Sequence, residues 1–100
     1  MPLSTDGAAL RLKADDNVAV CLRAVPAGST LTFDGTVVRA VDVIPLGHKI
    51  ALRPIALGER VLKYGQSIGK ASTPIATGQH VHVHNVESIR GRGDLAEATP

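Results

Sequence analysis

Four seven-residue segments of this chain share one pattern: an apolar residue, two residues, a glycine, two residues and a second apolar residue. They begin at Val25, Ile44, Ile55 and Ile75, and their glycines stand at positions 28, 47, 58 and 78. The glycine spacings of 19, 11 and 20 residues indicate a long and a short unit that recur, an internal pseudo-repeat. A central glycine is typical of a turn that needs positive φ. The pattern therefore favours short strands joined by tight turns.

Runs rich in β-branched residues lie between these turns. Strands are expected at residues 17–24, 30–33, 36–40, 48–52, 60–64 and 79–85. Asp34-Gly35 joins the second run to the third as a two-residue hairpin turn. No window of about twelve residues keeps a helical period, so the sequence predicts an all-β fold.

The length of 100 residues suits one domain. Residues 15–88 carry the strand pattern, whereas residues 1–14 and 89–100 are expected to be flexible ends. Phe33 and Tyr64 are the two aromatic residues, so valine, leucine, isoleucine and alanine must build the core.

Composition excludes several functions. The net charge is +2, and no basic run is interleaved with stacking aromatics, which argues against nucleic-acid binding. No stretch of about eighteen apolar residues predicts a membrane span. Cys21 is the one cysteine and lies in an apolar run, so it is expected to be buried in a protein of the reducing cytoplasm. An exposed strand edge or aliphatic patch would suit docking on a partner or self-association into a homo-oligomer.

Three of the four histidines alternate with valines at the end of the last predicted strand. In an extended strand, His80, His82 and His84 would share one face while Val81 and Val83 pack on the other. Same-face neighbours are about 6.6 Å apart, so at most two of these imidazoles can bind one metal ion, and other ligands would come from another polypeptide. A half-exposed strand whose polar face happens to be histidine fits the spacing equally well.

Other polar groups are less specific. His48 follows Gly47 at the start of a predicted strand and is compatible with the same site or with a surface position. Lys63 and Tyr64 end a strand, where they would hold an anionic substrate, act in acid-base chemistry or pack on the surface. Asp15-Asp16-Asn17 is predicted to form a turn before a strand rather than to supply carboxylate ligands.

Taken together, five segments resemble, in order, the small domain of the altronate and galactarate dehydratase family. They are Asp16-Asn17-Val18-Ala19-Val20, Gly47-His48-Lys49, Lys63-Tyr64-Gly65, Ile68-Gly69 and Gly78-Gln79-His80-Val81-His82-Val83-His84-Asn85. The resemblance covers about residues 15–88 and implies a compact β-clip fold of the SAF type.

The resemblance also implies an activity. Members of this family remove water from sugar acids such as altronate and galactarate, and a relative removes sulfite from sulfolactate. Their small domain is fused to a large catalytic domain or made as a separate small subunit, and a divalent metal, iron or manganese, takes part. This chain is therefore expected to be the small subunit of a carbon-oxygen hydro-lyase, inactive alone and bound to a large catalytic subunit.

Carried over to this sequence, the motif implies metal contacts from His82 and His84, with His80 as their neighbour. Substrate contacts are expected from His48, Lys49, Lys63, Tyr64 and Asn85. The acid and the base are not assigned. Two alternatives stay open: a non-catalytic β-clip module that binds a carbohydrate or a protein, and a subunit that only stabilises a large partner.

Overall fold

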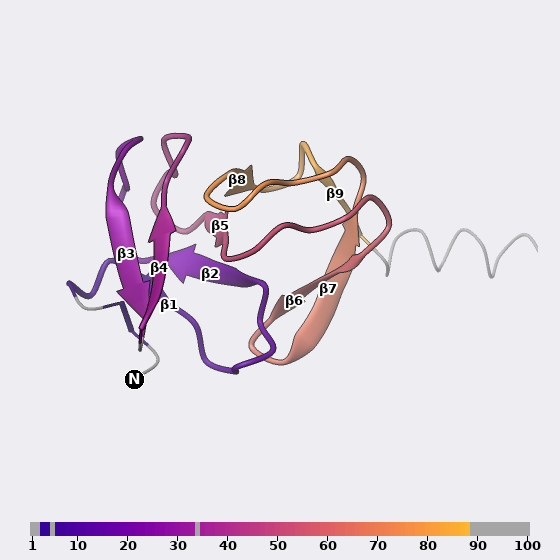
Figure 1. Cartoon of the computed structure of the whole chain (residues 1–100). Helices are drawn as coiled ribbons and strands as arrows, with labels where there is room; N and C mark the ends of the chain where they lie inside the picture. Colours follow the sequence, from indigo (N-terminus) through magenta and orange to yellow (C-terminus); the bar gives the residue numbers. More distant parts are fainter. Residues whose placement is uncertain (1–2, 5, 34, 89–100) are drawn as a thin grey trace, which may run out of the picture.

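The structure, a computed structural model, describes residues 3–4, 6–33 and 35–88, whose regular elements are all β-strands (Figure 1). The strands are β1 (Ala9–Leu10), β2 (Val18–Cys21), β3 (Thr30–Phe33), β4 (Thr36–Arg39), β5 (Lys49–Ala51), β6 (Arg60–Lys63), β7 (Gln66–Ala71), β8 (His80–Val81) and β9 (Val86–Glu87). They form antiparallel sheets in the orders β1-β2-β5-β8, β3-β4 and β6-β7-β9. The all-β prediction is confirmed. Within the described residues, no helix is long and apolar enough to cross a membrane.

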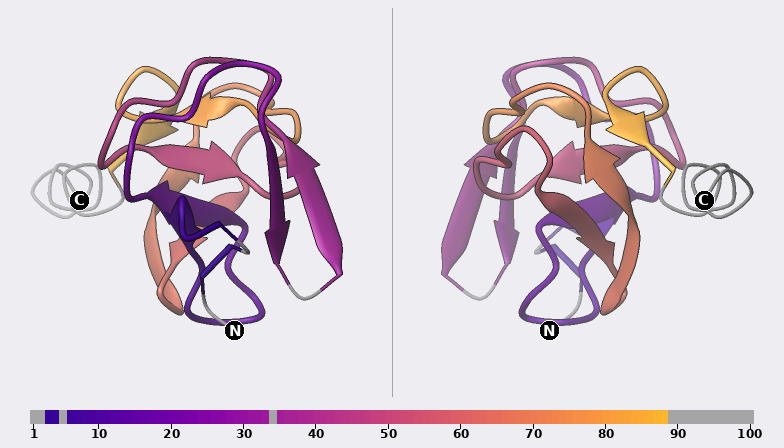
Figure 2. Two further views of the ribbon diagram at one scale, coloured as in Figure 1. Left: turned by 90° about the vertical axis from the view of Figure 1, so that its left-hand side faces the viewer. Right: turned by 90° about the vertical axis from the view of Figure 1, so that its right-hand side faces the viewer.

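The central sheet β1-β2-β5-β8 has an apolar cluster on each face (Figures 1 and 2). Successive side chains of a strand point to opposite faces. Ala19 and Ile50 accordingly face the β3-β4 hairpin, while Val18 and Ala51 face the sheet β6-β7-β9.

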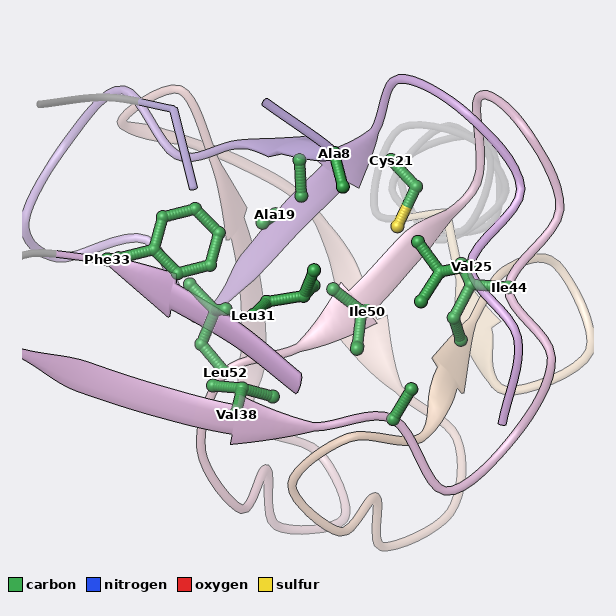
Figure 3. Close-up of a cluster of buried hydrophobic side chains, with 12 residues drawn as sticks. Ala8, Ala19, Cys21, Val25, Leu31, Phe33, Val38, Ile44, Ile50 and Leu52 are labelled. Carbon is green, nitrogen blue, oxygen red and sulfur yellow. The ribbon is translucent and has the colours of Figure 1, made fainter. Parts of the chain in front are cut away.

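The cluster under the hairpin, drawn in Figure 3, contains Ala8, Ala9, Ala19, Cys21, Val25, Leu31, Phe33, Val38, Ala40, Ile44, Ile50 and Leu52. The second cluster contains Val18, Ala51, Ile55, Val61, Ala71, Ile75 and Val81, with Ile68 and Val86 packed against it. Both cores are mainly aliphatic, as the composition predicted.

The four glycine-centred segments pair two by two. Their first apolar residues form antiparallel bridges, Val25 with Ile44 and Ile55 with Ile75. All four central glycines have positive φ, between 82° and 90°. Each glycine N–H donates, at 2.7–2.8 Å, to the carbonyl of the buried small residue that lies four positions before the partner segment; these acceptors are Ala40, Cys21, Ala71 and Ala51. The pseudo-repeat is therefore built as two mutually bonded pairs of turns.

Cys21 occupies the acceptor position four residues before its segment, which alanine fills before the other three segments. Its side chain is fully buried, and burial raises the pKa of its thiol to about 11. The prediction of a small buried residue is confirmed.

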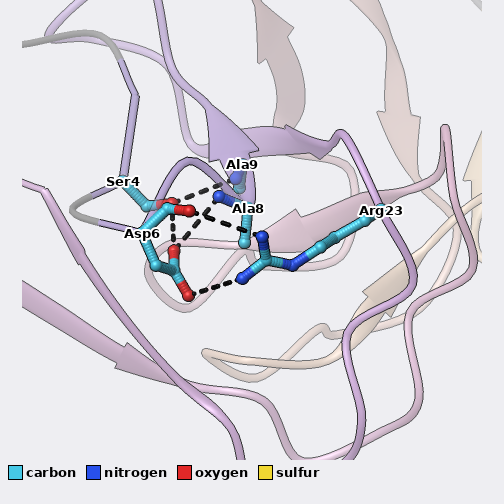
Figure 4. Close-up of polar contacts among 5 residues, drawn as sticks. All are labelled: Ser4, Asp6, Ala8, Ala9 and Arg23. Carbon is cyan, nitrogen blue, oxygen red and sulfur yellow. Dashed lines mark hydrogen bonds and ion pairs between the residues drawn. The ribbon is translucent and has the colours of Figure 1, made fainter.

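The N-terminal segment differs from its expected flexibility. Ala8 and Ala9 are buried, and β1 pairs with β2. Polar contacts hold the segment in place (Figure 4): Ala9 N–H donates to Ser4 Oγ at 3.0 Å, and the Asp6 carboxylate lies 3.0 Å from the Arg23 guanidinium. Short strands without a hydrophobic alternation gave no sequence signal here. The expected flexible tail at 89–100 lies outside the described residues.

Strands β2 to β6 lie within their predicted ranges, and β3 matches its range at both ends. The predicted two-residue hairpin connects Phe33 to Thr36. β1, β7 and β9 were not predicted, because β7 is rich in polar and small residues and the other two have two residues each.

Gly78 has the most crowded surroundings of the four central glycines. A Cβ atom there would overlap the carbonyl oxygen of Arg39, whereas a Cβ on Gly58, with a similar φ of +82°, meets nothing within 4 Å. We expect Gly58→Ala to lower the free energy of unfolding by about 1–2 kcal/mol, the cost of the left-handed backbone alone. Gly78→Ala should cost at least about 3 kcal/mol or prevent folding. Urea unfolding of both variants tests this difference, and equal losses would contradict it.

Candidate functional site

The pairing of β5 with β8 brings together histidines that are far apart in the sequence. Lys49 lies opposite Val81 and Ile50 opposite His80. One further step in this register places His48 opposite His82, and their rings stack with centroids 3.7 Å apart and planes 13° apart. Strand register, rather than sequence spacing, therefore makes His48 part of the histidine group.

All four histidines form one cluster. The Nδ1 of His48 lies 2.7 Å from the Nε2 of His80, a hydrogen bond in which one ring carries the proton. The ring centroid of His80 is 5.0 Å from that of His48 and 4.9 Å from that of His84. His48, predicted from a weak signal, thus lies beside the three alternating histidines.

The alternating histidines do not lie on one strand, so the predicted strand at 79–85 is wrong over most of its length. β8 ends at Val81, and the chain turns at residues 82–85 with a hydrogen bond from Asn85 N to His82 O at 3.1 Å. Val81 is fully buried as expected, but Val83 is 81% exposed rather than packed in the core. The turn brings His84 back toward His80, which an extended strand would not do.

Asn85 shapes this turn. Its side chain is buried, its Oδ1 accepts a hydrogen bond from His82 N at 3.0 Å, and its Nδ2 donates to His80 O at 2.9 Å. A buried amide with both ends bonded to backbone holds the turn in one conformation. Its expected contact with substrate stays a prediction.

Lys49 lies near the histidines, and Lys63 lies near Lys49. Burial lowers the pKa of Lys49, and the nearby charge of Lys63 lowers it further. The Nζ of Lys63 is 5.2 Å from the ring centroid of Tyr64. The charge of Lys49 in turn lowers the pKa of His82. The structure therefore brings the predicted Lys49 and Lys63 into the surroundings of the histidine cluster, with Tyr64 next to Lys63.

Asp16 and Asn17 fix the hairpin that carries Lys63 and Tyr64. The buried Asp16 carboxylate accepts hydrogen bonds from the backbone N–H groups of Tyr64 at 3.0 Å and Gly65 at 2.8 Å. Asn17 bonds both Arg60 O and Leu62 N. Tyr64 has a φ of 56°, the one positive value among the described residues other than glycine. A turn before β2 is confirmed, although it spans residues 13–16 rather than 15–17, and the side chains of Asp16 and Asn17 position a second turn far along the chain.

Burial and neighbouring charges favour the neutral form of His80 and His82. Burial is the main cause that lowers the pKa of each from its ordinary value of 6.5. Neighbouring histidines add to both shifts. Asp42, which the sequence gave no reason to select, opposes the shift at His80, and its Oδ2 accepts a hydrogen bond from His80 N at 3.0 Å.

The repeated turns explain why His48 is available to the cluster. In two turns, the residue after the glycine accepts a hydrogen bond from the backbone N–H two positions before the glycine: Glu59 from Ala56 at 2.8 Å and Gln79 from Ala76 at 2.7 Å. In the turn at Gly47, the equivalent residues are His48 and Pro45, and proline has no N–H to donate. The imidazole has no turn amide to bond and joins the cluster instead.

The described residues alone do not fit a metal ion. No group of three or more histidine, cysteine, aspartate or glutamate side chains among them is arranged to hold one. The 2.7 Å between the His48 and His80 nitrogens is a hydrogen bond. Two nitrogens on one tetrahedral ion, each about 2.0–2.1 Å from it, would be about 3.3 Å apart. The Nδ1 of His82, however, is buried and has no hydrogen-bond partner within this part of the chain, so it is open to a ligand atom.

Paired glycine turns, a central sheet shared by two cores and a cluster of imidazoles beside two lysines define a small all-β domain with a cationic site. Comparison with known sequences identifies the class. A profile of the altronate/galactarate dehydratase SAF domain matches residues 7–89, and the chain belongs to this family.

Individual relatives support this family assignment. The chain is 37% identical over 91 residues to an altronate dehydratase of Bacillus subtilis and 42% identical over 79 residues to one of Escherichia coli. It spans only 18% and 16% of their lengths, although the matches cover 91% and 79% of this chain. The chain is also 45% identical over 84 residues to the (2R)-sulfolactate sulfo-lyase subunit alpha of Chromohalobacter salexigens. This match covers 77% of this chain and 89% of that protein.

The depressed pKa values of His80 and His82 predict a loss of stability in acid. Between their folded pKa values and 6.5, the unfolded chain binds more protons than the folded chain, so stability falls as the pH falls through 6.5. Urea unfolding of the metal-free chain between about pH 8 and pH 5 measures this slope. His80→Gln and His82→Gln should each flatten it. A slope that these variants leave unchanged would contradict the assignment.

Two substitutions should give the turn at Gly47 the side-chain hydrogen bond that the turn at Gly78 has. In the double variant Pro45→Ala and His48→Gln, the new N–H can bond the glutamine side chain, as Ala76 bonds Gln79. We expect a favourable coupling free energy of about 0.5–1 kcal/mol between the two substitutions, measured by urea unfolding in a double-mutant cycle. No coupling would mean that Pro45 does not determine the freedom of His48.

Proposed function

We propose that this chain is the small subunit, or the small domain, of a metal-dependent lyase that eliminates water or sulfite from a hydroxy acid. It contributes histidines and lysines to a site shared with a larger catalytic polypeptide and is inactive alone. Family membership supports the lyase. The relatives support the larger polypeptide, since the chain matches under a fifth of two altronate dehydratases and most of a protein named as one subunit.

The observation that carries this proposal is the convergence of four imidazoles and two lysines from three separate segments. Cationic groups attract an anionic substrate, and Lys49 loses part of its hydration in the folded chain. A carboxylate bound beside Lys49 and Lys63 would restore the interactions that burial removes. The unpartnered Nδ1 of His82 would then bond a substrate oxygen.

The reaction class requires removal of a proton next to a carboxylate and departure of a β substituent. A neutral imidazole accepts a proton near pH 7 and can donate it again once protonated, and burial favours the neutral form of His80 and His82. The hydrogen bond between His48 and His80 gives a path for one proton between two rings. These residues suit acid-base work, and the roles of acid and base are left unassigned.

In this proposal, most of the metal ligands come from the larger polypeptide. We propose iron or manganese for the assembled enzyme, with at most two ligands from His80, His82 and His84. The hydrogen-bonded His48 and His80 support a minor share for this chain. We also place the protein in the cytoplasm, where a free buried thiol such as Cys21 is typical.

Substitutions at the cluster should impair turnover by the assembled enzyme. His82→Gln, His84→Gln and Lys49→Met should each lower kcat/KM about tenfold to a hundredfold, the effect of losing a hydrogen bond to a charged group. Lys70→Met, on an exposed part of β7, is the matched control and should leave kcat/KM unchanged. The measurement is a lyase assay on altronate, galactarate and sulfolactate, with added iron or manganese.

The same assay separates the alternatives. Full turnover by the histidine and lysine variants would favour a subunit that only stabilises its partner. If the wild-type chain neither binds a larger polypeptide nor supports turnover on any substrate, the proposal fails and a binding module of another kind is indicated.

A further inference from the structure

Val83 is the most exposed large hydrophobic residue in the described part of the chain, with 81% of its surface accessible. It lies between His82 and His84 in the loop that joins β8 to β9, which projects from the body of the domain (Figures 1 and 2). Single exposed apolar side chains are common, and Val83 differs from the others by its place, because it lies between two histidines of the cluster and would be covered by a molecule that closes over them.

The loop is held in one shape. Asn85 donates its backbone N–H to His82 O, and its buried side chain bonds His80 O and His82 N. These bonds prevent Val83 from folding back onto the core, where Val81 is already buried. A surface group that is fixed before binding loses little conformational entropy when a partner covers it.

The surroundings of Val83 are rich in groups that carry or accept positive charge. Four histidines are joined by ring contacts, and the charge of Lys49 reaches His82. The carboxylate placed against this cluster is Asp42, which bonds the backbone of His80. A complementary surface would therefore be apolar opposite Val83 and acidic at its edge.

The relatives indicate which molecule provides that surface. The same domain is part of chains more than five times its aligned length and also makes up most of a protein named as one subunit. A domain that works in both forms must contact the larger polypeptide through its own surface. Because the proposed shared site lies at the histidines, the loop between them faces the same partner.

We propose that Val83 docks in an apolar socket on the larger catalytic polypeptide, rimmed by carboxylates, and that this contact closes the histidine cluster from water. This inference rests on the proposed function, which supplies the partner. The Val83 contact is distinct from substrate binding, because the valine has no polar atom to bond a hydroxy acid.

The chain offers a clean chemical test. Its one cysteine, Cys21, is fully buried with a thiol pKa raised to about 11, so it does not compete for a thiol reagent. Val83→Cys and, as a matched control, Val37→Cys each introduce one accessible thiol. Val37 is 61% exposed on β4, on the opposite side of the domain from the loop (Figure 1).

The rate of alkylation by iodoacetamide is measured for both variants, free and with the larger polypeptide at about ten times its Kd. Assembly should slow the reaction of the new thiol at 83 about tenfold, because roughly one chain in eleven stays free, and should leave the thiol at 37 unaffected. Val83→Asp should weaken assembly more than Val83→Lys, since the expected socket is acidic at its edge.

Each result has one meaning. Assembly and turnover with equal labelling at both positions would overturn the docking inference and leave the lyase proposal intact. Equal weakening by aspartate and lysine would overturn the acidic rim. Protection of position 83 without the larger polypeptide, rising with chain concentration, would assign the contact to a second copy. Absence of both assembly and turnover for the wild-type chain would overturn the proposed function and this inference together.

Discussion

The buried pair Asp16 and Asn17 is the constraint on which the rest of the structure depends. A carboxylate without a cationic partner is costly to bury unless hydrogen bonds replace its water, and backbone N–H groups of two distant turn residues supply them. Asn17 adds two bonds to the strand leading into that turn. The pair thus ties the start of the central sheet to the β6-β7 hairpin and fixes where Lys63 stands relative to the histidines. Polar side chains, rather than apolar contacts alone, determine the layout of the site.

Much of the fold could be predicted from the sequence because its turns have strong local chemistry. Positive φ favours glycine, and β-branched runs between such glycines favour strands, so β2 to β6 were found. The predicted strand at 79–85 is wrong beyond Val81. Alternation of histidine and valine also fits a turn whose conformation depends on the buried side chain of Asn85. The periodicity of apolar and polar residues alone cannot reveal such a tertiary constraint.

The candidate site was predictable in its residue types and less so in its arrangement. His80, His82 and His84 could be recognised from their spacing, but their meeting with His48 depends on the register of β5 and β8. Lys49 and Lys63 come together through two different sheets, which no local pattern encodes. Asp42 was missed because a lone aspartate that accepts one backbone hydrogen bond leaves no distinctive sequence signal.

Strands β2 and β5 supply side chains to both apolar clusters, so the two clusters share these strands as a common wall. Loss of either one exposes the back of the same strands, which makes unfolding a single cooperative event rather than two. A domain that unfolds as one unit carries its whole interior with it when its covalent connections change. Evolution can therefore attach it to a longer chain or release it as a separate polypeptide without redesigning its interior, and the relatives of this chain include both arrangements.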